Sequence, residues 1–212
     1  MGLTPLGHWR TMGFRLSFQR SVSLTESNER ANPQNTMSEF VRIKSPHDPY
    51  YADARALYAQ SFPYHEQREA PSQDRILSDP AYHFEVMLQE GTFAGIVLYW
   101  EGDSFLYVEH LAIDGSRRNQ GLGKQALGYL QAKGKTVILE IDPPIDAISQ
   151  RRQGFYERSG FVANPYPHVH PAYHPGYRGH DLVVMSSPKA ISADEYQAFN
   201  TLLVSRVMHA VY

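Results

Sequence analysis

Residues Tyr107–Leu130 read YVEHLAIDGSRRNQGLGKQALGYL and carry three local signals in a row. A mostly apolar run, Tyr107–Ile113, predicts a strand. The turn residues Asp114-Gly115-Ser116 follow, and a helix is expected over Gly121–Lys133. Free N–H groups at a helix N-terminus attract anions, and glycine lets a ligand approach the backbone closely. The stretch therefore predicts an anion site at Arg118–Lys124, whose two end residues add positive charge.

Two common phosphate-binding patterns, the Rossmann fingerprint and the P-loop, do not occur in this stretch. Arg118-x-x-Gly121-x-Gly123 instead resembles R/Q-x-x-G-x-G/A, the acetyl-CoA signature of the GNAT superfamily of N-acetyltransferases. A second motif of that superfamily, FYxxxGF, is similar to Phe155–Phe161, with Tyr156 at its tyrosine position. The two motifs stand in the order and spacing typical of the superfamily, and the resemblance covers about Met37 to Ser186.

The resemblance implies acetyl-CoA as cosubstrate and assigns its binding residues. The CoA pyrophosphate is expected on the loop backbone, and the pantetheine arm on an edge of the strand Tyr107–Ile113 that splays away from Thr136–Ile141. The implied cofactor-binding residues are Leu111, Ile113, Arg118, Asn119, Gln120, Gly121, Leu122, Gly123 and Lys124. Ser149 and Arg152 depart from the Asn and Ala that members often carry, and Arg152 is expected to reach phosphate instead.

Working outward, hydrophobic periodicity predicts an antiparallel meander followed by a β-α-β-α-β order. The expected strands are Phe40–Lys44, Tyr82–Gln89, Thr92–Trp100, Ser104–Ile113, Thr136–Ile141, Phe161–Ala163 and Asp181–Ser186. The expected helices are Pro49–Phe62, Ser72–Ser78, Gly121–Lys133, Ala147–Ser159 and Ala193–Ala210. This order belongs to the α/β or α+β class. The resemblance narrows it to a GNAT-like mixed, mostly antiparallel sheet with helices on both faces and a splayed central strand pair.

Acetyl transfer to an amine needs a neutral nucleophile, a polarised thioester and a protonated leaving thiolate. Tyr156 is the expected general acid, because a phenol and a thiolate have comparable basicity. Strand alternation places Tyr107, Glu109, Leu111 and Ile113 on one face, opposite Val108, His110 and Ala112. Glu109 is the expected base, and the alternatives are Glu140, a water molecule and an amine that deprotonates by itself. His110 is interpreted as a hydrogen-bonded core histidine.

Two loops carry further polar side chains. Phe62–Glu69 is interpreted as a charged, solvated loop. The loop Asn164–His180 holds four histidines, three tyrosines and four prolines, and His168, His170 and His174 have spacings that zinc accepts. The prolines stiffen this loop, so we expect it to shape the substrate site, with Arg178 as a candidate for a substrate carboxylate, and we expect no metal.

Length, charge and cysteine content set broader limits. The 212 residues suit one domain, and a net charge of -2 disfavours nucleic acid as a general partner. No apolar run is long enough to span a membrane, and the absence of cysteine excludes a thiolate metal site or nucleophile. Residues 1–36 are expected to be a disordered leader or an organelle transit segment before a domain over 37–212. The expected location is the cytoplasm, or an organelle if the transit reading holds.

The sequence thus yields two functional hypotheses. The first is an N-acetyltransferase that moves an acetyl group directly from acetyl-CoA to a primary amine of a small molecule or peptide. The alternative is a catalytically inactive CoA-binding or regulatory module, in which the loop 164–180 serves a partner or a metal. A homodimer through the C-terminal strand and helix is also expected.

Overall fold

The computed structural model describes residues 38–209 and 211–212, so the predicted leader 1–36 and the domain start at Met37 lie outside the described residues. The strands are β1 (Glu39–Ile43), β2 (Tyr82–Gln89), β3 (Thr92–Glu101), β4 (Phe105–Ile113), β5 (Thr136–Ile141), β6 (Val162–Ala163), β7 (Val169–His170), β8 (His180–Asp181) and β9 (Val183–Ser187). The helices are α1 (Tyr51–Ser61), α2 (Ala70–Ile76), α3 (Leu122–Gln131), α4 (Ala147–Arg158) and α5 (Ala193–Leu202).

One large sheet organises the molecule, with strand order β1-β2-β3-β4-β5-β9-β6, and a small second sheet pairs β7 with β8. Neighbours in the large sheet are antiparallel except β4 and β5, which are parallel. The predicted mixed, mostly antiparallel sheet is therefore confirmed. Within the described chain, no helix is long and apolar enough to cross a membrane.

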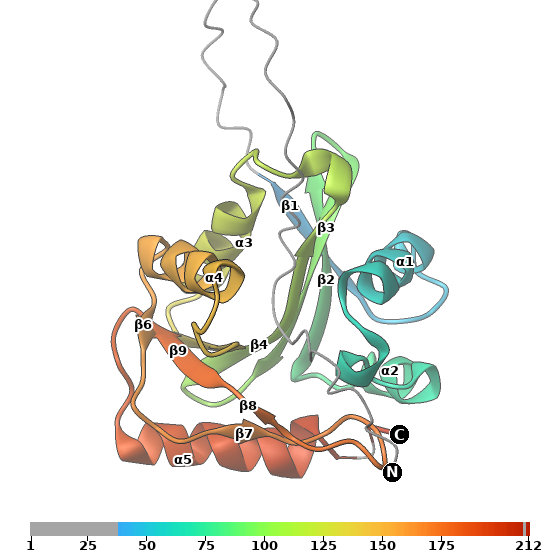
Figure 1. Ribbon diagram of the computed structural model, residues 1–212. Helices are drawn as coiled ribbons and strands as arrows, with labels where there is room; N and C mark the ends of the chain where they lie inside the picture. The colour runs from blue at the N-terminus through green and yellow to red at the C-terminus, as the bar shows by residue number, and fades with distance from the viewer. Residues whose placement is uncertain (1–37, 210) are drawn as a thin grey trace, which may run out of the picture.

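Helices cover both faces of this sheet, as the sequence predicts (Figure 1). Helices α1, α2 and α5 lie over one face, here named the α1/α5 face, where Leu57 and Phe199 join its core. Helices α3 and α4 lie over the other, the α3/α4 face, where Leu127 and Tyr156 join a separate core. A side chain on the sheet therefore belongs to one of two environments, depending on the face to which it points.

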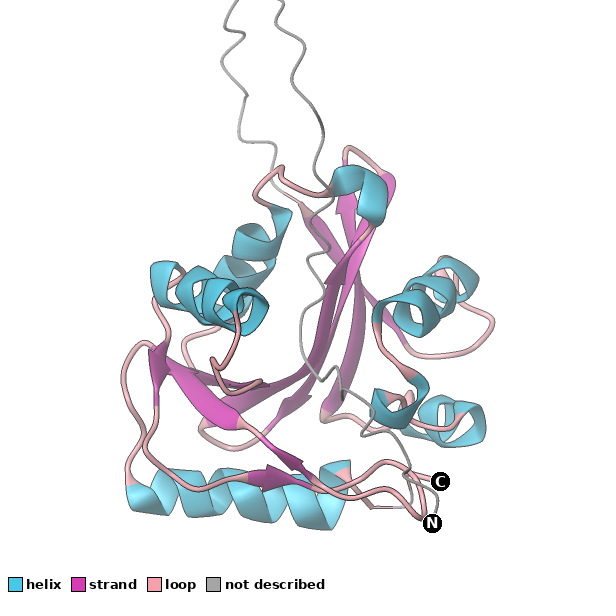
Figure 2. Ribbon diagram, viewed as in Figure 1, coloured by secondary structure: helices cyan, strands magenta, loops and turns pink. Residues whose placement is uncertain are grey.

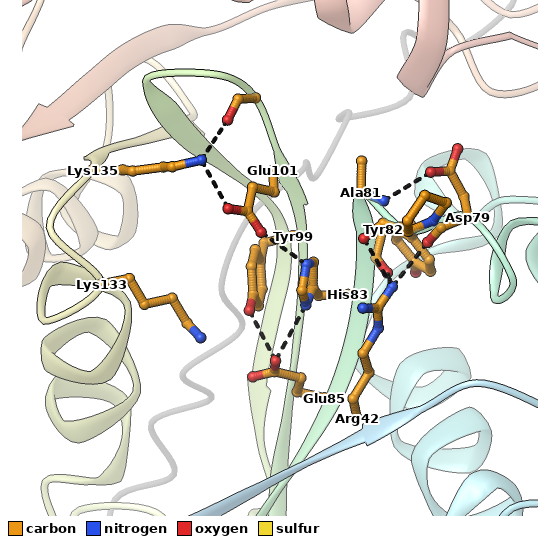
Figure 3. Close-up of polar contacts among 12 residues, drawn as sticks. Arg42, Asp79, Ala81, Tyr82, His83, Glu85, Tyr99, Glu101, Lys133 and Lys135 are labelled. Atoms are coloured by element: carbon orange, nitrogen blue, oxygen red, sulfur yellow. Dashed lines mark hydrogen bonds and ion pairs between the residues drawn. The ribbon is translucent and has the colours of Figure 1, made fainter.

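A polar network holds the meander in register away from the centre of the sheet (Figure 3). Tyr99 donates to Glu85 at 2.8 Å, and His83 bridges Glu85 and Glu101 at 3.4 and 3.2 Å. Lys135, the residue before β5, lies 2.8 Å from the same Glu101 carboxylate. The ion pair thus fixes the start of β5 beside the end of β3.

Two predicted elements at the C-terminal end differ from the structure. The strand expected over 181–186 is divided at Leu182, whose N–H donates to the carbonyl of His168, so β8 pairs with β7 while β9 joins the large sheet. The helix expected over 193–210 is α-helical only to Leu202 and continues as a π-helical turn, Leu203–Val207. Local apolar patterns do not specify the sheet that a short strand joins, which is decided by distant partners.

Candidate active site

The centre of the large sheet opens between β4 and β5. Their parallel ladder ends at the pair Val108 and Leu139, although β4 continues to Ile113 and β5 to Ile141. The end of β4 therefore lacks a strand partner on its β5 side among the described residues. Backbone groups require hydrogen bonds, so such an edge can pair with an extended ligand. This is the predicted splayed pair, and it leaves the backbones of Leu111 and Ile113 beyond the ladder.

A β-bulge lies at the point where the strands separate. In the β3–β4 ladder, Leu98 is opposite His110 and Tyr99 is opposite Val108, so Glu109 is an extra residue on β4. Bulges bend a strand and shift its in-and-out alternation by one position. The bulge therefore bends β4 at the place where β5 stops pairing with it.

This bulge makes one prediction wrong. The sequence places four side chains on one face of the strand, and they do not share it: Tyr107, Glu109, Leu111 and Ile113. Tyr107 lies in the core of the α1/α5 face, whereas Leu111 and Ile113 lie in the core of the α3/α4 face. Glu109 and its neighbour His110 both contact residues of the α1/α5 face. Two consecutive polar side chains thus enter the same buried region.

The Glu109 carboxylate is buried and held from three sides. Oε1 lies 3.0 Å from Nη2 of Arg68 and accepts the Tyr173 hydroxyl at 2.8 Å, and Oε2 accepts the Trp100 indole N–H at 2.8 Å. Burial alone would raise the pKa of Glu109, but the Arg68 guanidinium and these hydrogen bonds outweigh it and hold that pKa below its ordinary value. Glu109 is therefore ionised with both oxygens engaged, an arrangement that favours positioning over proton acceptance.

Glu140 on β5 has a different set of partners on the same face. Its Oε2 accepts the Tyr107 hydroxyl at 2.6 Å, and its Oε1 is hydrogen-bonded to Nε2 of His168. His170 Nε2 lies 3.9 Å from Oε2. Burial opposes ionisation, but the two imidazoles and the tyrosine hydrogen bond together keep the pKa of Glu140 below its ordinary value.

A cavity of about 20 Å³ lies among these groups, with Glu109, His110, Glu140, His170 and Tyr173 in its wall. A space of this size holds about one water molecule or one amino group. The cavity brings together the two predicted base candidates, Glu109 and Glu140. It also adds two imidazoles that the predicted catalytic set did not include.

His110 is a core histidine that, among the described residues, has a hydrogen bond at only one of its two ring nitrogens. Its Nε2 is 3.0 Å from the carbonyl oxygen of Glu66, and the rings of Tyr58 and Phe62 pack edge-on against it. Nδ1 has no hydrogen-bond partner within the described residues. Burial lowers the pKa of His110 to about 4, so the ring is neutral at physiological pH.

Tyr156, the predicted acid, lies on the other side of the sheet from the two carboxylates. Helix α4 carries it into the core of the α3/α4 face together with Leu111, Ile113 and Leu139, which flank the split. Burial raises the pKa of its phenol above the ordinary value, so the hydroxyl keeps its proton at neutral pH. The candidate acid and the candidate bases thus approach the split from opposite faces.

The predicted anion loop is placed at the end of β4 and opens α3. Gly121, with φ of 77°, is the residue before α3, and Asn119 also has a positive φ, of 65°. Among the described residues, no side chain caps the first turn of α3, and a Cβ on Gly121 would meet no atom within 4 Å. The first N–H groups of α3 therefore have no side-chain cap within the described chain, which suits an anionic group.

The two departures from the family pattern have structural roles in α4. Ser149 forms a capping box with Asp146 at the helix start. Arg152 forms an ion pair with Asp142, which follows β5. The expectation that Arg152 reaches a phosphate is therefore not supported, because a nearby carboxylate already holds this side chain.

The histidines of the loop 164–180 contact different partners. His168 and His170 lie at Glu140, whereas His174 stacks on Tyr64 at 4.1 Å and lies 3.2 Å from the Glu69 carboxylate. In the part of the chain that the structure describes, no group of three or more His, Cys, Asp or Glu residues could hold a metal ion. The segment runs alongside α5 (Figure 2), where His168 Nδ1 meets the Tyr196 hydroxyl at 3.0 Å.

Sequence reasoning missed several residues that surround Glu109. The segment 62–69, interpreted as solvated, buries Phe62, Glu66 and Arg68. The hydrogen bonds from Trp100 and Tyr173 to Glu109 were also not predicted, because they depend on contacts between residues distant in the sequence. The only usable signal was the odd composition of the loop 164–180, which pointed to the right segment without indicating partners.

A sequence model of the Acetyltransferase (GNAT) family matches residues 50–161, just over half of the chain. The chain is also 30% identical over 107 residues to "Putative acetyltransferase YjbC" of Bacillus subtilis (strain 168). That alignment covers 49% of this chain and 53% of the relative, so the chain spans about half the length of that protein.

Solved structures agree with this match. A protein titled "Putative acetyltransferase from GNAT family" from Bacteroides thetaiotaomicron has a TM-score of 0.75 and 26% identity, and covers 80% of this chain and 98% of its own. Naa50 of Arabidopsis thaliana, solved with the bisubstrate analogue CoA-Ac-MVNAL, has a TM-score of 0.51 and 13% identity over 71% of this chain and 98% of its own. At that identity the likeness concerns the fold alone.

Proposed function

We propose that this chain, which belongs to the GNAT family of acetyltransferases, transfers an acetyl group from acetyl-CoA to the primary amine of a small molecule or peptide. The observation that carries the proposal is the split between β4 and β5. An anion-ready loop lies at the α3 end of this split, and a polar cavity of amino-group size lies on the α1/α5 face. The two substrates of such a transfer would then meet across the split.

For acetyl-CoA, the supporting features are backbone features. The open first turn of α3 and the loop Arg118–Lys124 would hold the pyrophosphate through N–H groups and positive charge. The unpaired side of β4 would take the amides of the pantetheine arm as an added strand does, through Leu111 and Ile113. This arrangement would fix the thioester beside the bulge at Glu109.

For the chemistry, the amine nitrogen would attack the thioester carbonyl, and the C–S bond would break with its electron pair on sulfur. Tyr156 would donate a proton to the leaving thiolate, since its phenol keeps that proton at neutral pH. Glu109, ionised and clamped, would hold the acceptor side of the site in place. Positioning two substrates across the split would supply much of the rate enhancement.

The test is binding followed by turnover. Isothermal titration with acetyl-CoA should show one site per chain, and a panel of primary amines should then release free CoA only in the presence of protein. Binding without CoA release from any amine would support the alternative, a CoA-binding module without catalysis. Absence of binding would overturn the proposal as a whole.

A further inference from the structure

We infer that His170 Nε2 is the group that accepts the proton of the acceptor amine, with Glu140 behind it as a positioning residue. The inference deepens the proposed acetyl transfer and rests on it. His170 lies in β7, nine residues after the second motif ends at Phe161, and its side chain is fully buried in the wall of the cavity beside Glu140.

The two carboxylates are poorly placed to accept a proton. Both oxygens of Glu109 already receive hydrogen bonds, from Arg68 and Tyr173 on one side and from Trp100 on the other. Both oxygens of Glu140 are likewise engaged. A carboxylate that is already fully hydrogen-bonded gives up existing contacts when it is protonated, which makes it a weak base.

The tautomer of His170 is determined by its neighbour. Its Nδ1 lies 2.6 Å from the carbonyl oxygen of Pro171, which can only accept, so Nδ1 carries the hydrogen. Nε2 of the neutral ring therefore presents a lone pair. Within the described residues this atom has no hydrogen-bond partner, although it is buried. A buried, unpartnered lone pair in the wall of the cavity is what a proton acceptor requires.

His110 offers the same feature and, among the described residues that line the cavity, is the one rival. The carbonyl of Glu66 fixes its Nε2–H, so Nδ1 carries the lone pair. However, His110 sits between aromatic rings near the Arg68 guanidinium, and its pKa of about 4 makes the ring a weak base. At His170, by contrast, the distance between Nε2 and a carboxylate oxygen of Glu140 is 3.9 Å. This is close enough for the carboxylate to stabilise an imidazolium.

The surroundings of His170 are otherwise close to neutral. Tyr173 stacks on its ring at 5.2 Å, and His180 lies opposite it in the β7–β8 ladder. His168 and His110 are the other imidazoles nearby, and Glu109 is the second carboxylate in the cavity wall. Glu109 is compensated by Arg68, which leaves Glu140 as the charge that acts on His170.

In the step that follows, the amine forms the C–N bond while the C–S bond breaks and its electron pair goes to sulfur. The proton on the amine nitrogen passes to His170 Nε2, and sulfur takes the proton of Tyr156. His170 then returns its proton, and Tyr156 regains one, by exchange with water. The net products are the N-acetylated amine and CoA, so atoms and charge balance.

The experiment compares four variants of the full chain with the best amine from the panel. His170→Asn keeps an N–H donor near the Pro171 carbonyl but removes the basic ring nitrogen. We expect kcat to fall on the order of 10²-fold while the Kd for acetyl-CoA is unchanged. The limb of the pH profile of kcat/KM that reports imidazole deprotonation should disappear. Glu140→Gln should lower kcat while the limb is retained, because this carboxylate positions the ring and does not itself accept the proton.

The matched controls are His110→Gln, which removes the rival lone pair, and His180→Asn, which makes the same change outside the cavity wall. Both should keep the imidazole limb.

Retention of kcat and of the limb by His170→Asn overturns the inference while leaving acetyl transfer intact, and loss of the limb in His110→Gln reassigns the base. If His170→Asn does not fold, ¹⁵N NMR of the wild-type ring decides. An Nδ1–H tautomer supports the inference, and an Nε2–H tautomer overturns it. A wild-type chain that binds acetyl-CoA but acetylates no amine refutes both proposals.

Discussion

The two sides of the β4–β5 split differ in where their chemistry comes from. On the α3 side, the proposed anion loop, Arg118–Lys124, would use backbone N–H groups of consecutive residues at the start of one helix. On the α1/α5 face, the cavity is lined by buried side chains of residues far apart in sequence, such as Glu109, Glu140 and His170, and Arg68 pairs with Glu109 behind its wall. A local backbone site tolerates change around it, whereas a buried charge cluster depends on every partner. Mutations on the two sides should therefore affect different measured quantities.

The largest effect is expected from Arg68→Met, which leaves Glu109 as a buried charge without its cation. Breaking a buried pair from one side typically costs about 3–5 kcal/mol of unfolding free energy. Urea unfolding should show this loss. The matched control is Arg206→Met, whose pair with Asp79 is partly exposed, 46% and 26% for the two side chains, and should cost less than about 1 kcal/mol. Equal, small losses in both variants would mean that the cluster does not depend on this pair.

A second effect concerns the pH dependence of stability. The pKa of His110 is about 4 in the folded chain against an ordinary 6.5, so the unfolded chain binds the proton first on acidification. Stability should fall as the pH drops from about 6.5 towards 4, by up to about 3 kcal/mol over that whole range.

His110→Gln is the variant that isolates this effect. It keeps a donor for the Glu66 carbonyl and removes the titrating ring, so unfolding free energies measured across that pH range should change less than in the wild type. The same slope in both proteins would place the titration on another group.

A third effect isolates the anion loop. Gly121→Asp places a negative charge beside the first turn of α3 and strains a residue with φ of 77°. Affinity for acetyl-CoA should fall by at least about 10²-fold by isothermal titration, while the cavity on the other face is unaffected. The control is Gly128→Asp, the same charge change on α3 beyond its first turn. Comparable losses in both variants would indicate a general charge effect instead of a local site.

The smallest effect is expected from Tyr156→Phe, which removes one hydroxyl from the α3/α4 core and keeps the ring. Turnover should fall about 10- to 100-fold because the thiolate then leaves without its proton donor. The melting temperature should change little, since the ring still packs in the same core. Turnover close to that of the wild type would assign the proton donation to water.

The sequence predicted best where the signal is local. The strand Thr136–Ile141 has the predicted bounds, and α3 and α4 begin within a residue of expectation, because apolar period, glycine and capping residues act over one or two turns. The predicted Asp181–Ser186 strand was divided instead, since β8 and β9 are too short to specify their own partners. β9 also lies between β5 and β6, and β6 pairs with it at Met185 and Ser186, while dimerisation stays a prediction.

By itself the sequence determined most of the helices and strands of the large sheet, the position of Tyr156 on α4 and the start of α3 that the proposal assigns to an anion, because each depends on neighbours within a few residues. Only the tertiary structure decided the buried cavity on the α1/α5 face, which the proposal assigns to the acceptor amine. The extra residue Glu109 reversed the alternation of side chains between the two faces along β4. No local sequence pattern predicts this bulge, because it arises from the pairing of β4 with β3. The roles of Arg68 and His170 likewise arise from burial beside carboxylates distant in the chain. Charge and hydrogen-bond partners act through space, so they can be read only after the chain has folded.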